Sequence, residues 1–130
     1  MLKFLSDEWF IKVTELYKNS GDLKMPKIMT DLKVNLTVKA ANAEVQMCLN
    51  GGIIQKGFLD NADVSMTMPA EYAYKLMVLN DWSVGMPGYI KKDISVSGNL
   101  KKLSPLQAYK PSRPSVEFYK KLAAFTDFKA

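Results

Sequence analysis

The stretch Asn61–Met77, NADVSMTMPAEYAYKLM, changes its hydrophobic period at Pro69. Before Pro69, apolar residues alternate with polar ones, and this period of two is typical of a strand with one buried face. Pro69 suits the first turn of a helix, where Glu71 adds a charge of favourable sign. Apolar residues then continue at helical spacing, namely Tyr72, Ala73, Leu76, Met77 and Leu79. The stretch therefore predicts a strand that runs directly into an amphipathic helix.

Three more strands are predicted before this one. The alternation in 32–39 places Leu32, Val34, Leu36 and Val38 on one face, and that in 43–50 places Ala43, Val45, Met47 and Leu49 inward, with Cys48 outward. Gly51 and Gly52 supply the residues of positive φ that a tight hairpin requires. A third strand follows in 53–59, so that the four strands are expected to form a meander.

Helices are predicted on both sides of these strands. Asp7 and Glu8 follow a capping Ser6, and Gly21 ends this first helix. After the Asn61–Met77 stretch come a short link, a fifth strand with Ile94 and Val96 inward, an interrupted helix around 100–109 and a last helix in 115–128. Strands bounded by helices predict an α+β fold, a five-stranded and mostly antiparallel sheet with helices covering one face.

Length and composition indicate one domain, residues 1–130, without a signal peptide or membrane span. The single Cys48 fits a reducing compartment, and we expect a cytoplasmic protein. The chain has no histidine. It therefore lacks the commonest general base and metal ligand, and we expect no enzyme activity, no catalytic residues, no metal and no cofactor.

Charge is concentrated in the second half of the chain. Residues 1–65 carry eight lysines and eight acids, whereas residues 66–130 carry ten basic residues and five acids. Such an excess can face an anionic membrane or an acidic partner, or it can simply be solvated surface. Nothing in the chain is typical of a nucleic-acid-binding motif, and no nucleic-acid partner is expected.

Two segments carry a resemblance to a known family. DVSMTMPAEYAYKLM (63–77) and YIKKDISVSGNLKKL (89–103), together with the order of predicted elements, resemble the sterol carrier protein type 2 family and look like a stand-alone, bacterial-type member. The resemblance implies a sterol-carrier-like fold with an apolar cavity between sheet and helices and the C-terminal helix as its cover. It also implies a fatty acid, acyl-CoA, sterol or other lipid as ligand.

Methionines support a cavity, because an unbranched and polarisable side chain adapts to a flexible ligand, although each of them could equally fill a core. The side chains expected to line the cavity are apolar residues of the strands, helices and link: Phe10, Val13, Met47, Met66, Met68, Leu76, Trp82, Met86, Tyr89, Phe118 and Leu122.

The predicted function is therefore the non-catalytic binding or carrying of an apolar ligand. The alternative is an accessory or dimerisation module with a filled core that assists a partner enzyme, for example in lipid or quinone metabolism, through the apolar faces of its first and last helices. A homodimer is compatible with either. Transient contact with an anionic membrane is expected through Lys101, Lys102, Lys120 and Lys121.

Overall fold

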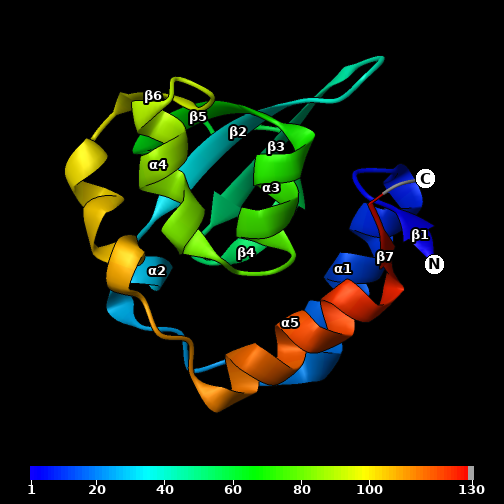
Figure 1. Ribbon diagram of the computed structural model, residues 1–130. Coiled ribbons are helices and arrows are strands. Elements are labelled where there is room, and N and C mark those ends of the chain that lie inside the picture. Colours follow the sequence, from blue (N-terminus) through cyan, green and yellow to red (C-terminus); the bar gives the residue numbers. More distant parts are fainter. Residues whose placement is uncertain (129–130) are drawn as a thin grey trace.

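The sheet is the centre of the fold. The structure is a computed structural model that describes residues 1–128. Within this range the main sheet has five strands in the order β4-β3-β2-β5-β6 (Figure 1). All pairings are antiparallel except that of β2 with β5. The predicted α+β class and mostly antiparallel sheet are confirmed. The strands are β2 (Lys33–Lys39), β3 (Glu44–Asn50), β4 (Ile53–Lys56), β5 (Val64–Pro69) and β6 (Ser95–Gly98).

The predicted meander of four strands is wrong at its last step. Strands β2, β3 and β4 do form a meander, but β5 lies on the other side of β2 and runs parallel to it. The connection from β4 to β5 is held by Asn35, whose amide donates to the Leu59 carbonyl (2.9 Å) and whose Oδ1 accepts from the Leu59 N–H (2.7 Å). An alternating pattern gives the face of a strand and not its neighbour, so the sequence did not reveal this crossover.

One face of the sheet is apolar and buried, as predicted. Leu36, Met47 and Met66 lie side by side across three strands, and all three are buried. Ala43 is exposed and lies outside β3, so its predicted inward position is wrong. Cys48 lies on the opposite face, as alternation requires, yet it is buried rather than exposed to water, because it sits in a central row between its cross-strand neighbours Asn35 and Gln55.

Two helices pack against each other beside the sheet. Helix α1 (Asp7–Ser20) is capped by Ser6 and ends at Gly21, as predicted. Helix α5 (Arg113–Phe125) lies along α1 (Figure 1) and is shorter at its C-terminus than predicted. The chain instead leaves α5 to form β7 (Thr126–Asp127), which pairs in parallel with β1 (Leu2–Lys3) and brings the two ends together. A strand of two residues is too short to show an alternating hydrophobic pattern in the sequence.

The remaining helices surround β5 and β6. Pro69 lies at the N-cap position of α3 (Ala70–Met77), one residue before the first turn in which it was predicted. Leu79 lies beyond the helix and is half-exposed, so its predicted inward position is wrong. The predicted helix at 100–109 forms two 3-10 segments, η2 (Leu100–Lys102) and η3 (Ser104–Ala108). The elements that complete the fold are η1 (Trp82–Val84), α4 (Gly85–Ile90) and α2 (Lys27–Thr30).

Candidate functional site

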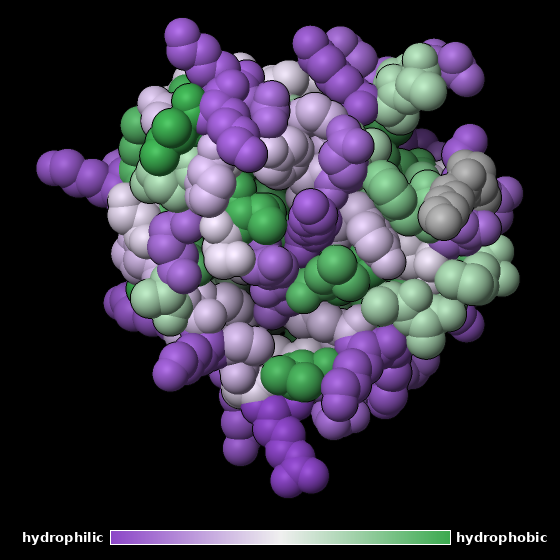
Figure 2. All heavy atoms as spheres, viewed as in Figure 1, coloured by the Kyte–Doolittle hydropathy of each residue, from purple (hydrophilic) through white to green (hydrophobic). Residues whose placement is uncertain are grey.

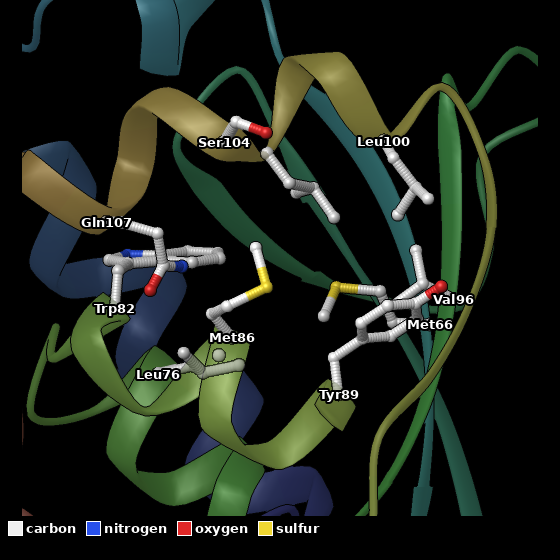
Figure 3. A pocket seen from close by; sticks show the side chains of 11 residues that line it. Met66, Leu76, Trp82, Met86, Tyr89, Val96, Leu100, Ser104 and Gln107 are labelled. Atoms are coloured by element: carbon white, nitrogen blue, oxygen red, sulfur yellow. The ribbon is translucent and has the colours of Figure 1, made fainter. Parts of the chain in front are cut away.

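An apolar cavity of about 210 Å³ lies between the β5–β6 edge of the sheet and the helices that follow these strands. Met66 and Val96 form its floor, and Leu76 of α3 forms one wall. Figure 3 shows Trp82 and Gln107 at one end, Tyr89 and Leu100 at the other, and the Met66 and Met86 side chains in the space between. The other lining residues are Gly85, Leu103 and Ser104.

The floor is continuous with the wall because β5 leads into α3 without a loop. Pro69 ends the strand and caps the helix with φ −64° and ψ 157°. Its ring fixes φ near this value and carries no N–H that would need a partner in the first turn. Met66 and Leu76 are only ten positions apart in the sequence. One short segment therefore supplies both the floor and a wall of the cavity.

Asp63 anchors the segment that closes the cavity from above. Its carboxylate accepts from the Lys33 N–H (3.2 Å) and lies 3.2 Å from the Lys102 Nζ. Its carbonyl accepts from the Asn99 N–H (3.0 Å). Gly98 passes so close that a Cβ there would lie 2.5 Å from the same carbonyl oxygen, and its φ is +100°. These contacts tie η2 to the start of β5 and hold Leu100 over the sheet.

Helix α4 reaches the cavity because it approaches α3 closely. A Cβ on Gly88 would lie 2.7 Å from side-chain carbons of both Tyr72 and Ile94, so a larger residue there would force these side chains to shift. Met86 and Tyr89 lie on the other side of α4 from Gly88 and contribute to the cavity wall.

Trp82 closes one end of the cavity. Its indole N–H donates to Oδ1 of Asn80 (3.1 Å), and the Asp81 carboxylate accepts from the Ser83 N–H (3.1 Å) at the start of η1. The ring is therefore fixed by a hydrogen bond as well as by packing, with its apolar surface toward the cavity.

The lining is apolar apart from a few polar groups. Ser104 and Gln107 are both exposed, and Tyr89 contributes a phenol. Among the described residues that line the cavity there is no carboxylate, amine or thiol. Such a site can exclude water and hold an apolar chain, but it offers no pair of groups for acid–base chemistry.

Five of the eleven side chains predicted to line a cavity lie in its wall: Met66, Leu76, Trp82, Met86 and Tyr89. The other six lie in the packed core around α1, α5 and the central strands: Phe10, Val13, Met47, Met68, Phe118 and Leu122. Their alternation or helical spacing indicates burial equally well in a filled core and in a cavity wall. The sequence therefore could not separate the two groups.

The C-terminal helix does not cover the cavity, contrary to what the family resemblance implied. Phe118 of α5 stacks on Tyr17 of α1 with ring centroids 4.5 Å apart. Below it, the Trp9 indole N–H donates to Oγ1 of Thr126 (2.8 Å). Helix α5 is thus fixed on α1, and the cover is formed by α4 with η2 and η3.

Six lining residues were not predicted, namely Gly85, Val96, Leu100, Leu103, Ser104 and Gln107. The inward position of Val96 and the spacing of Leu100 and Leu103 were signals in the sequence. They indicated buried positions without indicating that the space in front of them is empty.

Two buried phenols belong to the filled half of the molecule. The Tyr17 hydroxyl donates to the Gly52 carbonyl (3.1 Å) and accepts from the Ile54 N–H (3.1 Å), so it ties α1 to the β3–β4 hairpin. Burial raises the pKa of Tyr17 and, together with the neighbouring Tyr17 and Tyr109, that of Tyr119. Burial likewise raises the pKa of the Cys48 thiol, which is only 2% exposed. These groups stabilise the fold and do not face the cavity.

The two lysine pairs expected at a membrane lie on different elements. Lys101 and Lys102 belong to η2 at the cavity, whereas Lys120 and Lys121 belong to α5. Lys120 lines a separate groove of about 220 Å³ between the end of α3 and α5. Lys102 forms an ion pair with Asp63, whereas no described residue forms an ion pair with Lys101.

Residues 1–128 contain no helix that is both long and apolar enough to cross a bilayer. The same residues contain no group of three or more acidic or cysteine side chains placed to hold a metal ion.

Several solved structures of sterol carrier proteins are similar to this chain. Sterol carrier protein 2-like 2 from Aedes aegypti matches with a TM-score of 0.54 at 18% identity, over 79% of this chain and 97% of that chain. The like-3 protein from the same organism matches with a TM-score of 0.52 at 13% identity, over 78% and 92%. A solution structure of palmitated sterol carrier protein 2-like 2, also from Aedes aegypti, matches with a TM-score of 0.51 at 19% identity, over 83% and 99%.

At these identities the likeness shows a shared fold, and the sterol-carrier-like fold that the sequence predicted is confirmed. No protein-family model matches the chain. No curated protein matches it either.

Proposed function

We propose that this protein binds and carries an apolar ligand, a fatty acid or a related lipid, in the cavity between β5, β6, α3, α4 and the η2–η3 segment. The observation that carries the proposal is the 210 Å³ cavity itself, which has apolar walls and few polar groups. An acyl chain fits such walls, and its head group would meet one of the exposed polar side chains of the lining, Tyr89, Ser104 or Gln107. The ligand-binding unit in this proposal is residues 1–130, and its location is the cytoplasm.

The size of the cavity limits what can be buried. At about 30 Å³ for each water-sized group, 210 Å³ holds roughly seven methylene groups. At about 0.8 kcal/mol for each methylene, these contribute about 6 kcal/mol, which corresponds to an affinity between millimolar and micromolar. A tight ligand therefore needs head-group contacts at the mouth or a cavity that expands. Met66 and Met86 are the side chains best suited to such expansion.

Two further observations support the proposal. The cavity lining lacks the ionisable pairs that catalysis would need, so binding without reaction is the simpler function. The fold is that of sterol carrier proteins, one of which is described as palmitated. Fatty acid, acyl-CoA and sterol remain alternatives within this class, and the cavity volume favours a single narrow chain over a rigid ring system.

The alternative function, a filled accessory or dimerisation module, draws support from the α1–α5 half of the molecule, which is filled. Its expected interface was the apolar faces of the first and last helices. Val13 of α1 and Phe118 and Leu122 of α5 are buried inside the monomer, so these faces are already used.

Tryptophan fluorescence tests the proposal, because the chain has two tryptophans and only Trp82 lines the cavity. A fatty acid that carries bromine on its chain quenches an indole only on contact. We expect it to quench the wild-type protein and the Trp9→Phe variant, and not the Trp82→Phe variant. The two variants are matched, since each loses one indole N–H···O hydrogen bond.

Quenching that persists in Trp82→Phe would place the chain elsewhere, and an absence of quenching in the wild-type protein would favour the filled module. Native mass spectrometry of the purified protein gives an independent readout. A co-purified lipid in one-to-one ratio would support the carrier function and identify its ligand class.

A further inference from the structure

The mouth of the cavity is surrounded by apolar side chains that are unusually exposed. Met86, Tyr89 and Leu100 line the cavity and still expose 42%, 41% and 42% of their surface, and Ile90 exposes 71%. We call these four residues the rim. Figure 2 shows hydrophobic side chains gathered at the upper left of the molecule, over α4 and β6, with hydrophilic side chains projecting beside them. Clustered exposed apolar side chains usually mark an interaction surface.

The rim is built from one stripe of α4. Met86, Tyr89 and Ile90 are related by three and four positions, which places them on the same side of a helix. Gly88 lies on the opposite side, packed against α3 and Ile94. The close packing at Gly88 therefore directs the stripe outward, and Leu100 completes the rim from η2 across the mouth (Figure 3).

Positive charge surrounds the rim. The segment 82–110 carries five lysines and a single acid, Asp93. Asp93 already accepts a hydrogen bond from the Tyr72 hydroxyl (2.8 Å). Lys91, Lys92 and Lys101 are exposed, and within residues 1–128 none of them takes part in an ion pair. The surface around the mouth is thus apolar at its centre and cationic at its edge.

We infer that the rim docks on an anionic lipid bilayer, and this inference rests on the proposed carrier function. Apolar side chains with a tyrosine suit the boundary between head groups and acyl chains, and lysines beside them suit anionic head groups. A bilayer supplies both kinds of contact on one surface. It also supplies the ligand, which an apolar protein patch would not.

Docking at the rim lets the ligand pass from the bilayer into the cavity without crossing water. The rim residues Met86, Tyr89 and Leu100 are also cavity residues, so an acyl chain leaving the bilayer between them meets the cavity directly. The acyl chain is then not exposed to water during transfer, so the unfavourable hydration of its methylene groups is avoided. Lys120 and Lys121 lie on α5 and outside this surface. The proposed docking therefore uses Lys91, Lys92 and Lys101, and differs in this from the membrane contact expected from the sequence.

Vesicle sedimentation with the full chain tests the inference, using vesicles of phosphatidylcholine alone or mixed with phosphatidylglycerol. We expect binding only with the anionic mixture, and we expect Ile90→Asp to weaken it at least about tenfold. Ile11→Asp is the matched control, because Ile11 is an isoleucine of comparable exposure (61%) that lies on α1, outside the rim. It should bind as the wild type does.

Two double variants, each of which removes two positive charges, provide the second test. Lys91→Gln with Lys92→Gln should weaken vesicle binding about thirtyfold, at about a factor of five for each lysine near the surface. Lys120→Gln with Lys121→Gln removes the same charge from α5 and should leave binding within about twofold. Equal effects of the two pairs, equal binding of Ile90→Asp and Ile11→Asp, or undiminished binding to phosphatidylcholine alone would each overturn the inference.

The two proposals fail in different ways. Quenching of Trp82 by a brominated fatty acid in solution needs no membrane, and Ile90 does not line the cavity. Ile90→Asp should therefore keep this quenching while it loses vesicle binding. Quenching without vesicle binding in the wild-type protein would overturn membrane docking alone. If Ile90→Asp instead dissociated a dimer of the wild-type chain, the rim would be a contact between copies, and the inference would be refuted.

Discussion

Leu76→Ala should lengthen the fatty acid that the protein prefers. Leu76 is buried and forms a wall of the cavity, so its truncation adds space that is continuous with the existing 210 Å³. The substitution makes room for about three methylene groups, each worth about 0.8 kcal/mol when buried. The variant should therefore bind a chain long enough to fill the new space with about 2.4 kcal/mol more free energy, or about sixtyfold more tightly.

A series of saturated fatty acids from hexanoic to palmitic acid measures this effect, with displacement of a fluorescent fatty acid as the readout. Wild-type affinity should rise with chain length until the cavity is full, at roughly seven methylenes, and then level off. In Leu76→Ala the plateau should begin about three carbons later. A series on the apoprotein, stripped of lipid beforehand, avoids competition from a co-purified ligand.

Leu49→Ala is the control, because Leu49 is equally buried but lies on β3 and does not line the cavity. Both substitutions should lower the free energy of unfolding by about 2–5 kcal/mol, so circular dichroism must first show that both variants are folded. An unchanged plateau in a folded Leu76→Ala, or the same shift in Leu49→Ala, would refute the assignment of the acyl chain to this cavity.

Three further predictions concern the buried tyrosines, two glycines of positive φ and Cys48. Because the pKa values of Tyr17 and Tyr119 are raised in the folded protein, both phenols ionise above pH 10 only in the unfolded chain. The free energy of unfolding should therefore be unaffected by them below pH 10 and should fall as the pH rises further. Each Tyr→Phe substitution should reduce the slope of unfolding free energy against pH by about 1.4 kcal/mol per unit there, and an unchanged slope would contradict the burial. Gly98→Ala should destabilise the protein by about 3 kcal/mol or more, because a Cβ would lie 2.5 Å from a carbonyl oxygen. Gly57→Ala, at φ +86° with open space around the added Cβ, should cost only about 1–2 kcal/mol. Equal melting temperatures of the two variants would argue against the close approach at Gly98. Cys48 should react with a thiol reagent only after unfolding, since its thiol is buried and its pKa raised, and fast labelling of the native protein would contradict that position.

Local patterns in the sequence predicted the elements well where a short-range rule determines structure. The alternation in 32–39, the Gly51–Gly52 hairpin and the step from strand to helix at Pro69 are all present. The arrangement of strands depended on a contact that no local rule contains, the hydrogen bonds between Asn35 and the backbone of Leu59. The β1–β7 pair joins residues from opposite ends of the chain and left no pattern to recognise.

The candidate site was predicted only in part for a related reason. Hydrophobic periodicity identifies side chains that avoid water, and both Met66 and Met47 satisfy it. What distinguishes them is whether atoms fill the space in front of the side chain. Met47 faces a packed core, whereas Met66 faces the space beneath α4. That space depends on the approach of α4 at Gly88 and on the anchoring of η2 by Asp63, neither of which has a sequence signal.

The division into a filled half and a hollow half is itself an argument for binding. An apolar cavity of 210 Å³ forgoes packing contacts that a filled core would make, and these would be worth up to about 5 kcal/mol at about 24 cal/mol for each Å³. This is as large as the total stability of many small proteins. The aromatic packing of Phe4, Trp9 and Phe10, the Tyr17–Phe118 stack and the joined chain ends offset that cost away from the cavity. A ligand that fills the cavity recovers the lost contacts, so the feature that weakens the free protein is the same one that supplies the free energy of binding.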